Sequence, residues 1–200
     1  MVKKVRYYSF FQRFWHWLQA LSIVGLVLTG FEIYGFWSIV GFERAVKVHY
    51  RIFSVLVVLF VLAFFWYIVT GQWRQFIPSR DKILPVAKYY LLGVFKGEQH
   101  PHKRTPVNRL NSLQSLTYLA IMVGLLPFMG ITGGLYYYYH DLLSMGLNYS
   151  LAPVAFLHII GAIAFVVFLL GHIYMLTFGD GLWAHVKSML TGWGTVEEKQ

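Results

Sequence analysis

The stretch Pro153–Phe178 constrains the fold of this chain most, because it runs for 26 residues without Asp, Glu, Lys or Arg. An α-helix needs about 20 apolar residues to cross a hydrocarbon core of ~30 Å, so this stretch can span a membrane with some tilt. The sequence therefore predicts a transmembrane helix in the last quarter of the chain.

Two histidines, His158 and His172, lie inside this apolar stretch, 14 residues apart. That spacing corresponds to ~21 Å along a helix axis and falls within ~40° of four full turns, so both imidazoles face the same way at two depths. An ionisable residue inside a membrane indicates function, unless it merely bonds a neighbouring helix. Because haem iron takes axial imidazole ligands, the pair suits two stacked prosthetic groups and predicts two further histidines at matching depths.

Composition supports a membrane protein, since 58% of the residues are hydrophobic and only 12% are charged. The formal charge of +9 comes from basic residues that lie between apolar segments, so nucleic acid is not an expected partner. The chain has no Cys, which excludes disulfides, iron–sulfur ligation and thiolate zinc sites within it. The basic start is not expected to be a signal peptide, because a full-length apolar run containing His16 follows it.

We predict an all-α integral membrane four-helix bundle, a single domain of residues 1–200, with short interfacial helices. The predicted spans are residues 14–34, 48–70, 111–135 and 153–178, and residues 71–109 form a hydrophilic loop. Lys and Arg divide 14 to 3 between the two sides, so the positive-inside rule places both termini and this loop in the cytoplasm. Within the loop, residues 83–97 are either an amphipathic helix on the membrane surface or an irregular segment.

Two candidate ligand pairs follow from the predicted spans. His16 matches the depth of His172 near the inner face, and His49 matches the depth of His158 near the outer face. We expect His16/His172 and His49/His158 to ligate two haem irons, with packing histidines as the alternative. The other histidines are poorer candidates: His100 and His102 are expected to be solvated, and His140 and His185 to be interfacial.

Small and basic residues in or beside the spans fit either haem binding or ordinary helix packing. Glycines in the spans allow close helix approach and equally leave room for a macrocycle: Gly25, Gly124, Gly161 and Gly171. Arginines at span ends suit haem propionates, although arginines are common there in any case: Arg13, Arg51 and Arg109.

Several motifs resemble a known family. They are R-x-x-H-W at Arg13, His16 and Trp17, the His49 helix start, and H-x-x-G-A with G-H-I-Y-M at 158–162 and 171–175. Over nearly its whole length the chain resembles the di-haem four-helix cytochrome b subunits of bacterial respiratory formate dehydrogenase, nickel–iron hydrogenase and thiosulfate reductase. Residues 109–138 look most like the thiosulfate-reductase type, whereas the additional span frequent in the hydrogenase type is absent.

The resemblance implies two b haems and a site for menaquinone or ubiquinone beside the inner haem, in a bacterial or archaeal cytoplasmic membrane. The family's N-x-x-Q motif corresponds here to Asn111 and Gln114. Asn111 therefore becomes the quinone candidate, near His172, and Gln114, Trp17 and Arg13 are weaker candidates. Alternatively, Asn111 is the N-cap of the third span and Gln114 belongs to its first turn.

The predicted function is transmembrane electron transfer between quinone and a partner on the periplasmic side, as a subunit rather than a complete enzyme. The partner would be an iron–sulfur subunit or a multihaem cytochrome that docks on residues 36–50 and 136–152. One alternative is a stand-alone cytochrome b561-like superoxide:quinone oxidoreductase, which the basic residues Arg44, Lys47 and Arg51 mildly support. Another is a haem-free membrane anchor or proton-handling transporter, in which Glu32 is the deep carboxylate unless it reaches out to water.

Overall fold

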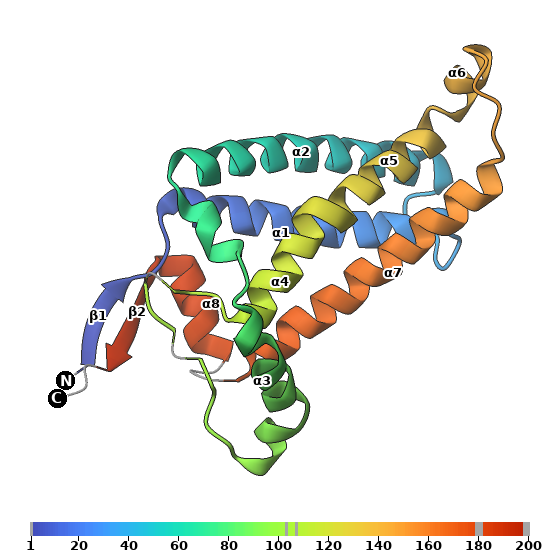
Figure 1. The fold of residues 1–200 in the computed structure, drawn as a ribbon. Helices are drawn as coiled ribbons and strands as arrows, with labels where there is room; N and C mark the ends of the chain where they lie inside the picture. Colours follow the sequence, from blue (N-terminus) through green and yellow to red (C-terminus); the bar gives the residue numbers. More distant parts are fainter. Residues whose placement is uncertain (1, 103, 107, 179–181, 198–200) are drawn as a thin grey trace. The chain divides into compact units, whose positions relative to one another are not determined.

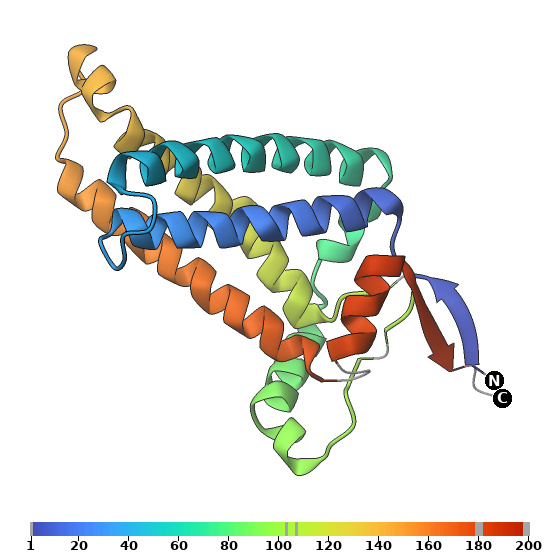
Figure 2. The same ribbon diagram turned by 180° about the vertical axis from the view of Figure 1, so that it is seen from behind.

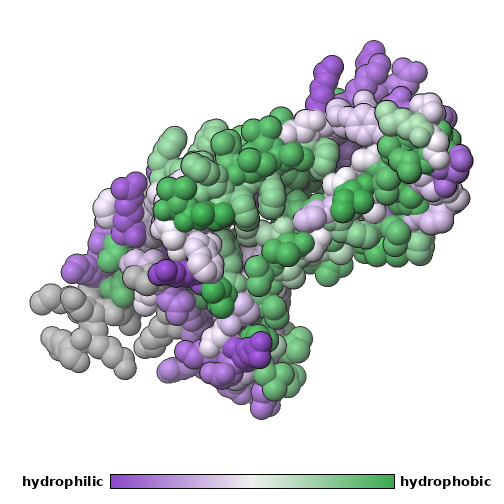
Figure 3. Space-filling model, turned by 45° about the horizontal axis from the view of Figure 1, so that its top comes forward, coloured by the Kyte–Doolittle hydropathy of each residue, from purple (hydrophilic) through white to green (hydrophobic). Residues whose placement is uncertain are grey.

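The computed structural model describes residues 2–102, 104–106, 108–178 and 182–197. Four helical segments in it are long and apolar enough to cross a membrane: α1 (Phe10–Ile33), α2 (Phe42–Val69), Ser112–Tyr137 and α7 (Leu151–Leu176). Hydrophobic residues make up most of the middle of the surface seen in Figure 3. The prediction of an all-α integral membrane protein with four spans is therefore confirmed.

The described residues group into two compact units. The first draws on residues 1–74, 105–109 and 180–200, and the second on residues 75–104 and 110–179.

In the first unit, α1 and α2 pack side by side (Figures 1 and 2). A capping box starts α1: the Ser9 hydroxyl accepts the Gln12 N–H, and the Gln12 side chain accepts the Ser9 N–H. The helix α2 begins six residues earlier than the predicted span, directly after Gly41 at φ 86°. The hydropathy pattern did not predict helix at residues 42–47, because the charged residues in this segment are compatible with a helix but not with hydrocarbon.

A buried carboxylate anchors the connection between α1 and α2. Glu32 Oε1 accepts backbone N–H groups from Ile39, Val40 and Gly41 at 2.8, 2.6 and 2.8 Å. Charge-assisted bonds of this kind hold the loop in one conformation. Glu32 therefore has a structural role in the loop and does not reach out to water.

The first unit also contains two strands that the sequence analysis did not predict. β1 (Val2–Arg6) pairs antiparallel with β2 (Trp193–Glu197), and the two strands lie side by side in Figure 2. Lys4 lies opposite Thr195. The helix α8 (Leu182–Thr191), expected as a short interfacial helix, leads into β2. Pairing between segments this far apart leaves no local signal, because five-residue strands are too short for a period-2 pattern to be distinctive.

In the second unit, the third span is a composite helix. It consists of α4 (Ser112–Ala120), a π-helical turn (Ile121–Leu125) and α5 (Leu126–Tyr137). Pro127 has no N–H for the carbonyl four residues earlier, and its ring crowds that carbonyl. The π-helical turn, which ends two residues before Pro127, accommodates the missing hydrogen bond and the bulk of the proline ring.

The helix α5 packs against α7 in the second unit. Gly161 of α7 is buried against Phe128 and Met129 of α5, where a Cβ would overlap the Met129 sulfur. Close helix packing therefore explains the glycine at this position, which was one of the two alternatives, the other being room for a macrocycle.

The segment 83–97 is helical, so the irregular alternative is wrong. α3 (Ile83–Lys88) continues through a π-helical turn (Tyr89–Gly93) and a 3₁₀ turn (Val94–Lys96). Val86 and Tyr90 are buried, whereas Leu84 and Phe95 are each 78% exposed. Two further 3₁₀ turns, Gln72–Phe76 and Arg80–Lys82, precede it, and α6 (Tyr139–Ser144) lies between α5 and α7.

Candidate functional site

His49, on α2, is held by a threonine–glycine pair of α1. The Thr29 hydroxyl lies 2.9 Å from His49 Nδ1 and 2.7 Å from the Gly25 carbonyl. A hydroxyl has one proton to donate. Because the shorter contact to the carbonyl takes this proton, His49 Nδ1 carries a hydrogen and donates it to Thr29, and Nε2 carries the lone pair that a metal can bind.

The second unit repeats this arrangement with different helices. The Thr132 hydroxyl of α5 lies 3.0 Å from His158 Nδ1 of α7 and 2.8 Å from the Phe128 carbonyl. The same proton count again assigns the hydrogen to Nδ1 and the lone pair to Nε2. This tautomer suits a metal ligand that binds through Nε2, at both His49 and His158.

A glycine follows each of these threonines and lies against the histidine ring. A Cβ on Gly30 would be 3.6 Å from His49 Cε1, and a Cβ on Gly133 would be 3.1 Å from His158 Cε1. The second distance is tighter than ordinary van der Waals contact, so Gly133 fixes the depth at which the ring sits. The dipeptide Thr-Gly thus forms the same cradle in both units.

The two inner-face candidates have different surroundings. His172 Nδ1 lies 3.3 Å from the Tyr118 hydroxyl, and the Phe168 ring packs beside it at 5.9 Å. His16 is half-buried on α1, with the Trp17 ring at 5.3 Å and edge-on to it. Trp17 donates its indole N–H to the Met189 carbonyl of α8 at 3.3 Å, so it also attaches α8 to α1.

Within each unit the histidines occupy two levels. In the first unit, His16 and the His49 partner Thr29 are 13 residues apart on α1, which is ~20 Å along the axis. In the second unit, His158 and His172 are 14 residues apart on α7, which is ~21 Å. Each predicted pair takes one histidine from each unit, so the pairing itself stays a prediction.

The three candidate arginines differ in their bonding. Arg13, three residues before His16 on α1, donates from Nη1 to the Leu190 carbonyl, while its buried Nε has no hydrogen-bond partner among the described residues. Arg51 is exposed on α2, two residues after His49. The Nε of Arg13 can therefore donate a hydrogen bond to an incoming carboxylate.

Arg109 is bound into the first unit. Its guanidinium donates to the Tyr7 carbonyl at 2.7 Å, to Gln12 Oε1 at 3.0 Å and to Gln72 Oε1 at 2.6 Å. These bonds tie three segments together, which is a sufficient structural reason for an arginine here.

Asn111 and Gln114 form the capping box of α4, as the alternative to a quinone role predicts. Asn111 Oδ1 accepts the Gln114 N–H at 2.9 Å, and Gln114 Oε1 accepts the Asn111 N–H at 3.0 Å. Asn111 is 2% exposed and donates from Nδ2 to the Tyr90 hydroxyl at 3.1 Å. That bond uses one of the two N–H groups of the carboxamide.

The expectation that His100 is solvated is wrong. It is half-buried, its Nε2 lies 3.0 Å from the Tyr90 hydroxyl, and its Nδ1 contacts the backbone of His102. Burial lowers the pKa of His100 against an opposing bond from His102, and burial raises the pKa of Tyr90. Neither Tyr90 nor His100 was identified as a site residue from the sequence, where the only signal was the unusual Tyr-Tyr and His-Pro-His composition of the loop.

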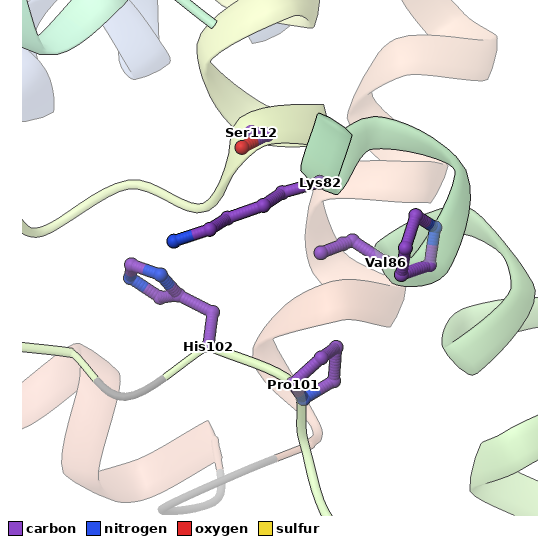
Figure 4. Close-up of a pocket in the computed structure, with 6 residues that line it drawn as sticks. Lys82, Val86, Pro101, His102 and Ser112 are labelled. Carbon is purple, nitrogen blue, oxygen red and sulfur yellow. The ribbon is translucent and has the colours of Figure 1, made fainter. Parts of the chain in front are cut away.

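A cavity of about 220 Å³ lies beside this group in the second unit. Figure 4 shows Lys82 reaching past Ser112 toward the ring of His102, with Val86 and Pro101 on the opposite side. Pro85 completes the lining. Ser112 directly follows Asn111, so the cavity adjoins the start of α4.

Four apolar spans bear histidines at two levels, and three of these histidines have Nδ1 hydrogen-bonded to a hydroxyl of a neighbouring helix, as in a haem-binding membrane cytochrome. A family model described as prokaryotic cytochrome b561 matches residues 7–192, and the chain belongs to that family. It is 30% identical to "Putative cytochrome YdhU" of Escherichia coli (strain K12) over 203 residues, which cover 96% of this chain and 75% of that protein. No solved structure matches significantly.

Membership in this family confirms the predicted resemblance to cytochrome b membrane subunits. It makes the chain a multi-pass protein of a bacterial membrane that binds b-type haem and transfers electrons across the membrane. The predicted cytoplasmic location of both termini stays a prediction.

Proposed function

We propose that this cytochrome carries electrons through two b haems, one near each membrane face, between menaquinone or ubiquinone and a redox partner on the periplasmic side. The observation that carries the proposal is the repeated cradle, Thr29–His49 in one unit and Thr132–His158 in the other. Two histidines held by the same kind of hydrogen bond suit the two axial ligands of one haem iron. His16 lies ~20 Å from Thr29 along α1, and His172 lies ~21 Å from His158 along α7; these two histidines supply the second pair.

Neighbouring side chains orient the histidine ligands and supply positive charge for the haem propionates. A hydrogen bond from Nδ1–H fixes the ring orientation and makes Nε2 a better donor to iron. Arg13 is the proposed partner of a propionate of the inner haem, and Arg51 and Arg109 are weaker candidates. When bound, haem supplies one-electron redox chemistry.

We place the quinone site at the start of α4, with Asn111, Gln114 and Trp17 as its candidate residues. Asn111 and Tyr118 are seven residues apart on one helix, which is ~10 Å along the axis and within ~20° of two full turns. Because Tyr118 contacts His172, a quinone beside Asn111 would lie about two helical turns from an inner iron ligand. The carboxamide has a second N–H to offer a quinone carbonyl.

The proposed partner docks on the segments 36–50 and 136–152, which contain the connections before α2 and around α6. Phe36, Ile39 and Met145 are 72%, 77% and 76% exposed in these segments. Exposed apolar side chains at a loop suit a protein partner such as an iron–sulfur subunit or a multihaem cytochrome.

A second candidate function is the stand-alone superoxide:quinone oxidoreductase. Arg44, Lys47 and Arg51 are all exposed on α2, and their spacing puts them on one helix face. A basic stripe attracts a small anion as well as an acidic partner. Isolation of the native complex discriminates between these functions, because a catalytic subunit that co-purifies with the chain excludes the stand-alone form.

The haem-free anchor or proton-handling transporter is not supported. Its one deep carboxylate, Glu32, binds the backbone of the α1–α2 loop, and the family to which the chain belongs is one of cytochromes.

The first test is an oxidised-minus-reduced visible spectrum of the purified chain, with haem quantified per chain as the pyridine haemochrome. We expect two b haems. His49→Ala and His158→Ala should each lose one and the same haem, and His16→Ala and His172→Ala the other. The controls His140→Ala and His185→Ala should retain both, and a wild-type chain without haem would refute the proposal.

A further inference from the structure

We propose that Tyr90 and His100 form a proton relay between the Asn111 end of the quinone site and the cavity that His102 lines. The relay rests on the proposed quinone reaction, because a quinol releases two protons when it is oxidised and a quinone takes up two when it is reduced. It assigns a chemical role to a tyrosine and a histidine that the electron-transfer proposal does not use.

The contacts of the relay lie within the second unit and run from Asn111 to the backbone of His102, whose side chain lines the cavity. Asn111 Nδ2 donates to the Tyr90 hydroxyl at 3.1 Å, and that hydroxyl lies 3.0 Å from His100 Nε2. On the far side of the ring, His100 Nδ1 is 2.8 Å from the His102 carbonyl and 3.0 Å from the His102 N–H. The ring of His102 faces the cavity of about 220 Å³ (Figure 4), which is large enough for several waters.

Both neutral tautomers of His100 have partners in this arrangement. With hydrogen on Nδ1, the ring donates to the His102 carbonyl and accepts from the Tyr90 hydroxyl at Nε2. With hydrogen on Nε2, it donates to the Tyr90 oxygen and accepts the His102 N–H at Nδ1. A residue that only stabilises the loop needs one tautomer, whereas a relay needs both to be accessible.

The surroundings keep the two groups neutral at ordinary pH. Tyr90 is 8% exposed, and burial raises its pKa while the bond from Asn111 opposes the rise. Burial lowers the pKa of His100. The titratable and charged groups around His100 are Tyr89 at 4.7 Å between ring centroids, Tyr90, His102, Lys82 across the cavity, and Glu98 two residues earlier in the chain.

The proton balance closes in either direction. During quinol oxidation, a quinol O–H gives its proton to the Tyr90 oxygen while the Tyr90 hydroxyl proton passes to His100 Nε2. The Nδ1 proton of His100 then leaves to water, and the ring is left with its hydrogen on Nε2. Loss of that hydrogen to water and uptake of one at Nδ1 restores the first tautomer with no net change in protons. Two such passages remove the two protons, while the two electrons leave one at a time to the haem chain, and quinone reduction reverses every transfer.

The test compares Tyr90→Phe and His100→Gln with the matched controls Tyr89→Phe and His140→Gln in the full-length, haem-loaded protein. The rate of haem reduction by a soluble quinol is measured from pH 5 to 9. We expect both relay variants to slow by about 100-fold, the lower limit of what positioned proton-transfer groups contribute. Haem content and reduction by dithionite should match wild type.

Two readouts separate a relay from a structural role. Added imidazole should restore part of the rate in His100→Ala, because it can accept the proton that the missing ring accepted. Nitrogen NMR of His100 should show averaging between tautomers in wild type and one fixed tautomer in Tyr90→Phe.

The relay is overturned if both relay variants react with quinol at the wild-type rate and pH profile, or if His100 keeps one tautomer in wild type and in Tyr90→Phe. A wild-type protein with two haems that no quinol reduces and no quinone oxidises overturns the quinone proposal itself, and the relay with it. The two failures are therefore distinguishable.

Discussion

The Thr29 hydroxyl accepts the Nδ1–H of His49 across the α1–α2 contact, at a distance of 2.9 Å. Thr132 and His158 repeat this bond at 3.0 Å between α5 and α7. In both cases the threonine donates its own proton to a carbonyl of its own helix, so the direction of the bond to histidine is fixed. A threonine in a helix commonly makes such a backbone bond, and here it also selects the tautomer of a neighbouring residue.

Replacing either threonine by valine should therefore weaken haem binding at the outer-face histidines. Thr29→Val and Thr132→Val keep the side-chain shape and remove the acceptor for Nδ1–H. Loss of such a supporting bond typically costs about 10- to 100-fold in metal affinity. Titration of the apoprotein with haem, followed at the Soret band, measures the change.

Thr117→Val is the matched control, because the Thr117 hydroxyl donates to the Leu113 carbonyl and belongs to the same composite span. It should leave both haem affinities unchanged. Equal losses in all three variants would show that the hydroxyls act on helix stability rather than on the ligands.

A methyl group at residue 133 should displace the His158 ring. The Cβ of Gly133→Ala would be 3.1 Å from His158 Cε1, whereas a Cβ on Gly134 meets nothing within 4 Å among the described residues. We expect haem content to fall from two per chain to about one in Gly133→Ala, measured as the pyridine haemochrome. Gly134→Ala should retain both haems and gain up to about 1 kcal/mol of helix stability, the usual difference between Ala and Gly.

Glu32→Gln should loosen the loop between α1 and α2. The neutral amide accepts the three backbone N–H groups more weakly than the carboxylate does, so thermal unfolding in detergent should begin at a lower temperature. Glu43→Gln, at an exposed position in the first turn of α2, is the control and should change the midpoint less. An unchanged midpoint in Glu32→Gln would contradict the anchoring role.

His100 should make folding stability depend on pH. Its pKa is lowered in the folded protein, so below about pH 6.5, the usual pKa of histidine, the unfolded chain binds a proton that the folded chain does not. Stability should thus fall as pH drops through this value and level off below the folded pKa. In His100→Gln this part of the dependence should disappear from thermal unfolding measured between pH 5 and 8, whereas His140→Gln should retain it.

The sequence predicted the four spans and the positions of the four histidines, because apolar length and helical spacing are local properties. His158 and His172 could be assigned to one face of one helix from their separation alone. The Thr-Gly cradle could not be recognised, since Thr29 and His49 meet only after two helices pack. The dipeptide is also too short to stand out in an apolar segment.

The boundaries and the loop were harder to predict for physical reasons. Hydropathy detects hydrocarbon contact, so it placed the start of the second span at residue 48, whereas backbone hydrogen bonding extends α2 to Phe42. His100 looked solvated because its neighbours in the chain are polar. The Tyr90 hydroxyl that binds it comes from the helical segment before the loop.

The pairing of β1 with β2 has a consequence for biogenesis. β1 precedes the four spans and β2 follows them, so the two strands cannot join until everything between them has been synthesised. By then all four of these spans have been offered to the insertion machinery. A sheet that holds both terminal segments together also requires an even number of membrane crossings between them, so a molecule with one segment left uninserted cannot close it.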